Sequence, residues 1–425
     1  MSTLTVQDAS TRPLPPVRLD RREIAGSFGD LGTLLPLAVL LITANRLNPT
    51  VLFGVVGLAY LLSGLYYRIP MAVQPLKSFS ALAIAHTLGP SVIAAGAMLM
   101  GLCLLILGVS GAATWISRRF PKALIRGIQL GVGLILIRVG LRLCVEPVGG
   151  SAMWLPAALT VGSLATILFF ARSKALPAGL LVVGGGVLVG FTLTGLPPVT
   201  PGPEIARVGG VSASDFWTAA ILLVLPQIPL TLINSLPATQ DVARKWYGPD
   251  SRRVTARALS IGMGIVNVAA GLVGGMPICH GSSGVTAHHR FGARTGGAGV
   301  FLGAVLLILA LGFGPSLTGL CNVIPRPVLG AMLVYVGVAH CLLIRDIAGW
   351  WSWAVVLAAG GIGGVMNHNG YGLAAGLAVL GVRWVGQRWL LRDKGTACLD
   401  IGRRREVLDP VRGSLASAAA AREHT

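Results

Sequence analysis

Apolar residues occur in long uncharged blocks along most of the chain. The blocks at residues 51–65, 91–115 and 296–323 are examples, and they approach or exceed the roughly 20 residues with which a helix crosses a bilayer. Proline, glycine and charged residues separate the blocks. The pattern predicts twelve segments of helix length and two shorter, interrupted ones, and therefore an all-α polytopic membrane protein.

The fourteen expected segments fall into two sets of seven. In the first half they are 25–44, 50–67, 73–88 (short), 90–116, 123–144, 152–171 and 176–195. In the second half they are 215–240, 254–274, 280–290 (short), 295–314, 325–344, 350–366 and 370–390. The predicted organisation is a cytoplasmic N-terminal tail (1–24), a first transmembrane repeat (25–195), an external linker (196–214), a second transmembrane repeat (215–390) and a cytoplasmic C-terminal tail (391–425).

Two landmarks suggest that the halves are related. Each short segment is third in its half and starts after a proline, Pro70 or Pro277, and the sequences Phe120–Lys122 and Ile324–Arg326 then follow at matching places. Seven is an odd number of crossings, so the second copy would be inverted. Inverted repeats with short broken segments at corresponding positions indicate a transporter whose site lies at the repeat interface. The alternative is a coincidence in a chain rich in glycine and proline.

Composition excludes a water-soluble globular protein, because 54% of the residues are hydrophobic and only 12% are charged, about half the soluble norm. The net charge of +19 could suggest nucleic-acid binding, but the basic residues lie at the ends of the apolar blocks. With a cytoplasmic N-terminus, 28 of the 34 lie on the cytoplasmic side and five outside. This bias predicts both termini in the cytoplasm and no nucleic-acid partner. No cleavable signal peptide is expected.

Lys77 is the one basic residue left inside the membrane. A charge at the centre of a span costs at least about 2.5–3.5 kcal/mol unless it is paired or hydrated. Gln74 and Ser78 lie beside it, and Pro75 suits the first turn of a helix. The alternative to a ligand site is a structural ion pair between Lys77 and Asp30.

The second short segment offers a matching set of polar groups. Glycine lets backbone amides approach a ligand and serine hydroxyls donate hydrogen bonds. The candidates here are His280, Gly281, Ser282 and Ser283. Two helix N-termini that meet near the midplane carry about +0.5 charge each, and with Lys77 they suit a dianion that has several acceptor oxygens.

Three further polar residues are candidates for the cavity or for coupling. Asp30 lies in the first span, and intramembrane carboxylates mark proton relays or ion pathways; a helix-terminus role near the interface is the alternative. Gln227 and Asn234 belong to the eighth segment, which Pro226 and Pro229 interrupt. They line the same cavity or only satisfy backbone groups that the prolines free.

No metal, cofactor or catalytic centre is expected. His280, His288 and His289 cannot share one helix face, and no carboxylate or thiolate cluster completes a metal site. The six cysteines show no regular framework. A membrane-embedded enzyme would need a convergent nucleophile or metal cluster, which this spacing does not provide.

Motifs spread along the chain resemble those of the molybdate transporter family, a branch related to the SulP sulfate permeases. They are Gly29–Thr33, Gln74–Ser78, Gln227–Ser235, Met276–Gly281 and Arg290–Arg294, and the resemblance covers nearly all of residues 24–390. It implies the seven-plus-seven inverted-repeat fold of the uracil transporter, with core and gate domains and an oxyanion held between the third and tenth helices. Gln74, Lys77, Ser78, His280, Gly281 and Ser282 would fall at that site.

The expected function is secondary active import of a tetrahedral oxyanion, molybdate first and sulfate second, with proton coupling through Asp30. The expected setting is the bacterial inner (cytoplasmic) membrane, the expected partners are the oxyanion, a proton and the bilayer, and a homodimer is left open. About thirty residues follow Arg392, too few for the STAS domain of sulfate permeases, which favours the molybdate branch. A passive anion channel is one alternative. A nucleobase carrier is another, although such carriers usually need paired acidic residues at the site.

Overall fold

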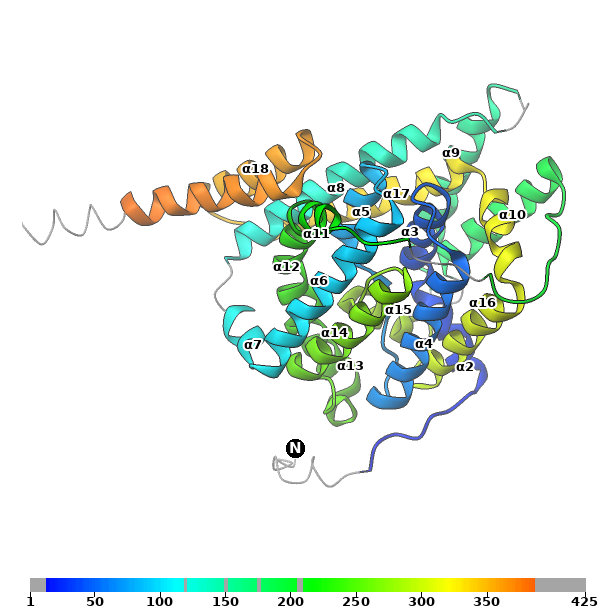
Figure 1. The fold of residues 1–425 in the computed structure, drawn as a ribbon, viewed down its shortest axis with the longest axis horizontal. Coiled ribbons are helices and arrows are strands. Elements are labelled where there is room, and N and C mark those ends of the chain that lie inside the picture. Colours follow the sequence, from blue (N-terminus) through cyan, green and yellow to red (C-terminus); the bar gives the residue numbers. More distant parts are fainter. Residues whose placement is uncertain (1–12, 118–120, 149–151, 174–176, 205–208, 387–425) are drawn as a thin grey trace, which may run out of the picture.

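The computed structural model describes residues 13–117, 121–148, 152–173, 177–204 and 209–386, and the fold is almost entirely helical (Figure 1). The elements of the first half are α2 (Arg21–Ser27), η1 (Phe28–Asp30), α3 (Leu31–Thr43), α4 (Pro49–Tyr67), β1 (Gln74–Pro75), α5 (Lys77–Ala85), α6 (Pro90–Val109), α7 (Ala112–Ser117), α8 (Lys122–Cys144), α9 (Leu155–Phe170) and α10 (Ala178–Thr194).

The second half begins with an interrupted rod and ends with long helices. Its elements are α11 (Ala213–Ala219), η2 (Ala220–Val224), α12 (Leu225–Leu230), η3 (Thr231–Ser235), α13 (Pro237–Tyr247), η4 (Gly248–Ser251), α14 (Ala256–Val273), β2 (Ile278–Cys279), α15 (Ser282–Arg290), α16 (Gly297–Val323), α17 (Arg326–Cys341), η5 (Leu342–Asp346) and α18 (Trp350–Val365). A last helix occupies 369–386. The predicted C-terminal tail (391–425) lies outside the described residues.

Eight helical stretches of the described chain are long and apolar enough to cross a membrane, and three shorter apolar helices accompany them. The prediction of an all-α multi-pass membrane protein is therefore confirmed. The number of fourteen crossings and the inverted relation of the halves stay predictions.

Several predicted boundaries move in the structure. The first helix begins at Arg21 rather than 25, because Asp20 caps it by accepting hydrogen bonds from two first-turn amides. The segment expected at 90–116 breaks after Val109, where Gly111 adopts a positive φ. The segment expected to end at 314 continues to Val323 through a kink at Phe313.

The two short segments meet each other across the molecule. Strands β1 and β2 pair antiparallel, with Gln74 opposite Cys279 and Pro75 opposite Ile278. Asn267 holds β2 from behind, since its amide group donates to the Ile278 carbonyl at 3.0 Å and accepts from the Ile278 amide at 2.7 Å. Helices α5 and α15, nine residues each, begin shortly after these two paired strands.

The helices pack in two groups. In the first group, which we call the core, α4 packs along α16 and α6 along α14; in the second, the gate, α8 packs along α17 and α18. Glycine permits close contacts between these helices: a Cβ on Gly57 would lie 2.9 Å from the Gly303 carbonyl oxygen. The core comprises α2–α6 and α11–α16, and the gate comprises α8–α10, α17 and α18.

Candidate functional site

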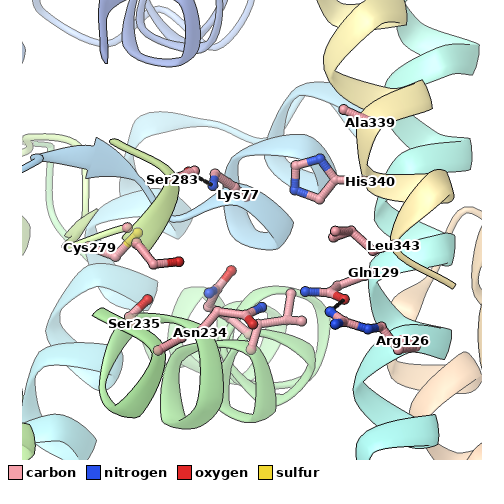
Figure 2. A pocket seen from close by; sticks show the side chains of 15 residues that line it. Lys77, Arg126, Gln129, Asn234, Ser235, Cys279, Ser283, Ala339, His340 and Leu343 are labelled. Carbon is pink, nitrogen blue, oxygen red and sulfur yellow. Dashed lines mark hydrogen bonds between the residues drawn. The ribbon is translucent and has the colours of Figure 1, made fainter. Parts of the chain in front are cut away.

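A cavity of about 390 Å³ lies where the core meets the gate (Figure 2). Its core wall is formed by Lys77, Gln227, Leu230, Asn234, Ser235, Ala238, Cys279, Gly281, Ser282 and Ser283, and its gate wall by Arg126, Gln129, Ala339, His340 and Leu343. Six of the ten residues predicted for the site or its surroundings are therefore in one place.

Lys77 is the first residue of α5 and projects toward the cavity (Figure 2). Its ammonium group donates a hydrogen bond to the Ser283 hydroxyl, 3.3 Å away on α15, so it connects the two short helices. None of the ion pairs within the described residues includes Lys77. The alternative of a structural Lys77–Asp30 ion pair is thus not what the structure shows.

Both short helices begin at this cavity. The first-turn amides of a helix have no acceptor in their own helix and carry partial positive charge. Gly281 and Ser282, at the start of α15, line the cavity. In α5 one of these amides is already used, because Phe79 donates to the side-chain oxygen of Gln227 at 3.0 Å. The other first-turn amides and the Lys77 ammonium group make the core wall electropositive.

The eighth segment supplies polar groups through an unusual backbone. Two π-helical turns, η2 and η3, flank the short helix that contains Pro226 and Pro229, and such turns occur often at functional sites. The second turn carries Asn234 and Ser235 at the cavity wall. Gln227 is held there because its amide nitrogen donates to the Thr231 hydroxyl at 3.0 Å.

The gate wall contributes a second cation that sequence reasoning assigned only to the cytoplasmic basic residues. Arg126 binds Asp346 through Nε (2.9 Å) and Nη2 (2.6 Å) and donates from Nη1 to Gln129 at 2.8 Å. Lys122 also pairs with Asp346, at 2.9 Å. The spacing of Arg126 and Gln129, three residues apart in an expected helix, is the signal that could have placed both on one face.

Three predicted site residues do not line this cavity. Gln74 is fully buried and donates to Asp30, and the Ser78 hydroxyl accepts from Asn369 at 3.2 Å. His280, predicted for the substrate site, instead bonds the Ala72 carbonyl through Nδ1 at 2.7 Å and lines a different cavity. These three side chains are held by partners inside the protein and do not line the cavity.

Asp30 is also buried and does not line the cavity. Its carboxylate accepts hydrogen bonds from Gln74 and, at 3.3 Å, from the Tyr60 hydroxyl. The other end of the Gln74 amide lies against Gly281, where a Cβ would overlap its oxygen. Gln74 therefore stands between the buried carboxylate and a residue of the cavity wall.

The charge of the cavity is one-sided. No aspartate or glutamate is among the described residues that line it, whereas Lys77 and Arg126 are. On the gate side Asp346 pairs with both Arg126 and Lys122, so these three groups keep a net charge of +1. On the core wall Lys77 has no ion-pair partner among the described residues. A wall with a cation, helix N-termini, hydroxyls and amides suits an anion that has several acceptor oxygens.

The sequence profile described as "Molybdate transporter of MFS superfamily" matches residues 22–136 and 219–339, together more than half of the chain. The chain belongs to the molybdate transporter family. This confirms the resemblance seen in the motifs, and it makes the protein a membrane transport protein rather than an enzyme. Both matched segments include residues of the cavity, Lys77 and Arg126 in the first and Asn234 and Ser282 in the second.

Curated relatives agree with this membership. The chain is 27% identical to "Molybdate transporter 2" of Arabidopsis thaliana, over 76% of this chain and 79% of that protein. It is 29% identical to "Molybdate transporter 1" of Chlamydomonas reinhardtii, over 76% and 83%. A more distant relative is "Guanine/hypoxanthine permease GhxP" of Escherichia coli O157:H7, 23% identical over 69% and 70%.

Solved structures share the fold. The transmembrane domain of the cyanobacterium bicarbonate transporter BicA superposes with a TM-score of 0.63 at 19% identity, over 85% of this chain and 98% of that one. A structure of SLC26A9 superposes with a TM-score of 0.59 at 16% identity, over 86% and 65%. At these identities the likeness concerns the architecture.

Proposed function

We propose that this family member imports molybdate, a tetrahedral dianion, and that the anion binds in the cavity between core and gate. The observation that carries the proposal is Lys77, an unpaired cation at the meeting point of two helix N-termini in a cavity wall without carboxylates among the described residues. The names of the curated relatives support molybdate over other oxyanions.

The transport mechanism we propose is alternating access. The cavity has one wall from each helix group, so a displacement of the gate relative to the core would open it to one side and close it to the other. The basic bias of the chain supports cytoplasmic termini, and we propose the bacterial inner membrane as the location.

Uptake by the purified protein in proteoliposomes tests this function. Radiolabelled molybdate is expected to accumulate, with unlabelled molybdate and tungstate as the strongest competitors and sulfate as a weaker one. Liposomes without protein are the control. Competition by sulfate at lower concentrations than molybdate would reassign the substrate, and uptake of labelled hypoxanthine without any oxyanion uptake would favour a nucleobase carrier.

A passive anion channel is distinguished by the driving force. A secondary transporter accumulates its substrate above the external concentration when an ion gradient is imposed, whereas a channel only equilibrates it. Accumulation that survives complete dissipation of all gradients, or that never exceeds equilibrium, would contradict the proposed mechanism.

Asp30 is the group we propose for proton coupling. It is buried, its hydrogen-bond partners are the neutral groups of Gln74 and Tyr60, and it forms no direct ion pair among the described residues. Buried carboxylates inside the membrane commonly serve as proton relays. Asp30→Asn is expected to abolish accumulation driven by an inward pH gradient while exchange of internal for external molybdate continues. Asp241→Asn, at an exposed position of α13, is the matched control. Gradient-driven accumulation retained by Asp30→Asn would refute the coupling role.

A further inference from the structure

A second cavity, of about 360 Å³, runs between α4 and α14 on the outside of the core. Residues at helical spacing on both helices form its walls, and the rear of β2 forms its floor. The residues that matter here are Leu62, Tyr66, Gly262, Ile265, Ile278 and His280. We call this cavity the α4–α14 groove.

The groove exists because each of its helices is drawn to another neighbour. Glycines bring α4 close to α16: a Cβ on Gly57 would lie 2.9 Å from the Gly303 carbonyl oxygen. Glycines also bring α14 close to α6, where a Cβ on Gly264 would lie 2.9 Å from the Leu105 amide nitrogen. Gly262, inside the groove, is different, because its Cβ would meet only the Tyr67 hydroxyl, at 3.5 Å. The groove is therefore open at this point.

The rims of the groove face the surroundings of the helices. Leu62 and Tyr66 are each 50% exposed, and Ile265 is 57% exposed. In a membrane-spanning protein such apolar side chains contact acyl chains rather than water. The groove is thus accessible from the hydrocarbon layer of the bilayer.

A cation stands at one end of the groove. Arg253 is exposed and lies shortly before α14 in sequence. It donates to the Tyr66 carbonyl at 2.7 Å and lies over the Tyr66 ring at 5.2 Å. None of the ion pairs of the described residues includes Arg253. Its guanidinium keeps further N–H donors in the geometry that binds phosphate. An apolar groove that ends at such a cation complements an amphiphile with a negative head and an apolar tail.

We propose that the α4–α14 groove binds an anionic phospholipid, with the phosphate at Arg253 and an acyl chain extending toward Ile278 and His280. The acyl chain would then support β2 from the side opposite to the substrate cavity. Cys279 of this strand lies in the wall of the substrate cavity, whereas the neighbouring Ile278 and His280 line the groove. The lipid would stabilise the paired strands at which α5 and α15 begin. This binding is independent of which anion is transported.

Photo-crosslinking tests the lipid site. The full chain is reconstituted in nanodiscs that contain a phospholipid with a photoactivatable acyl chain, as either phosphatidylglycerol or phosphatidylcholine, and the crosslinked peptides are identified by mass spectrometry. We expect crosslinks within residues 258–266, with phosphatidylglycerol preferred. Arg253→Gln is expected to reduce this preference about fivefold, as for the loss of one interfacial basic residue, whereas Arg172→Gln on the gate leaves it unchanged.

Filling the groove gives the second variant. Phosphatidylglycerol is expected to raise the Tm of the wild-type protein. Gly262→Leu is expected to remove both the crosslinks and this rise. Gly54→Leu, on α4 where a Cβ meets nothing within 4 Å, is the matched control and should retain both. Equal crosslinking by the two lipids would overturn the headgroup assignment, and unchanged crosslinking in Gly262→Leu would overturn the groove as the site. Phosphate added without lipid that raises the Tm equally would show that the headgroup site needs no acyl chain.

Discussion

Uptake of molybdate by the Lys77→Ala variant is expected to fall about a hundredfold below the wild-type rate. Lys77 is the positive charge of the core wall, and its ammonium donates a hydrogen bond to Ser283 on the second short helix. Its removal leaves the desolvated dianion with the partial charges of two helix N-termini on the core wall and, on the gate wall, with Arg126, which like Lys122 is held in an ion pair with Asp346. The measurement is the initial rate of radiolabelled uptake in proteoliposomes.

Two further variants test whether the loss of uptake comes from the missing charge of Lys77. Ser283→Ala removes the hydrogen bond that positions Lys77 but keeps the charge, and a decrease of about fivefold is expected. Lys245→Ala removes an exposed lysine of α13, and uptake should stay at the wild-type rate. A Lys77→Ala protein with an unchanged Tm and an undiminished uptake rate would exclude Lys77 from the substrate site.

The sequence predicts the class of fold well because bilayer thickness imposes a pattern on it. Apolar length and flanking charge mark most helices within a few residues, and proline starts such as Pro49 and Pro90 mark helix ends because proline fits the first turn. The pairing of β1 with β2 could not be predicted. Two residues per strand carry no periodic signal, and the partners lie about 200 residues apart.

The residues of the candidate site, too, could be predicted only in part. Residues at the broken helices were predicted because a lysine, serines and glycines are conspicuous in an apolar segment, and Lys77, Ser282 and Ser283 do line the cavity. His280 and Gln74 looked equally conspicuous, but their backbone positions turn the side chains away from it. Arg126 was missed because an arginine near a span end fits a membrane anchor equally well, and only tertiary packing brings α8 against α5 and α12.

The second large effect is expected when the positive charge at the gate wall is removed. Lys122, Arg126 and Asp346 form a trio with a net charge of +1. Arg126→Gln lowers this charge to zero and leaves the Asp346 carboxylate with Lys122 as its partner. The KM for molybdate is expected to rise about tenfold with little change in the maximal rate, because the interaction is lost equally in the bound state and in the transport step.

Adding Asp346→Asn to the Arg126→Gln protein restores the net charge of +1 without restoring the ion pair. If charge is what the trio provides, the KM of the double variant returns to within about threefold of the wild-type value, and the defect of the single variant shrinks as ionic strength rises. Arg138→Gln is the matched control on the same helix, since Arg138 bonds the Val365 carbonyl at 3.3 Å and does not line the cavity. An equally high KM in the single and double variants would show that Arg126 acts through its geometry with Gln129 and not through its charge.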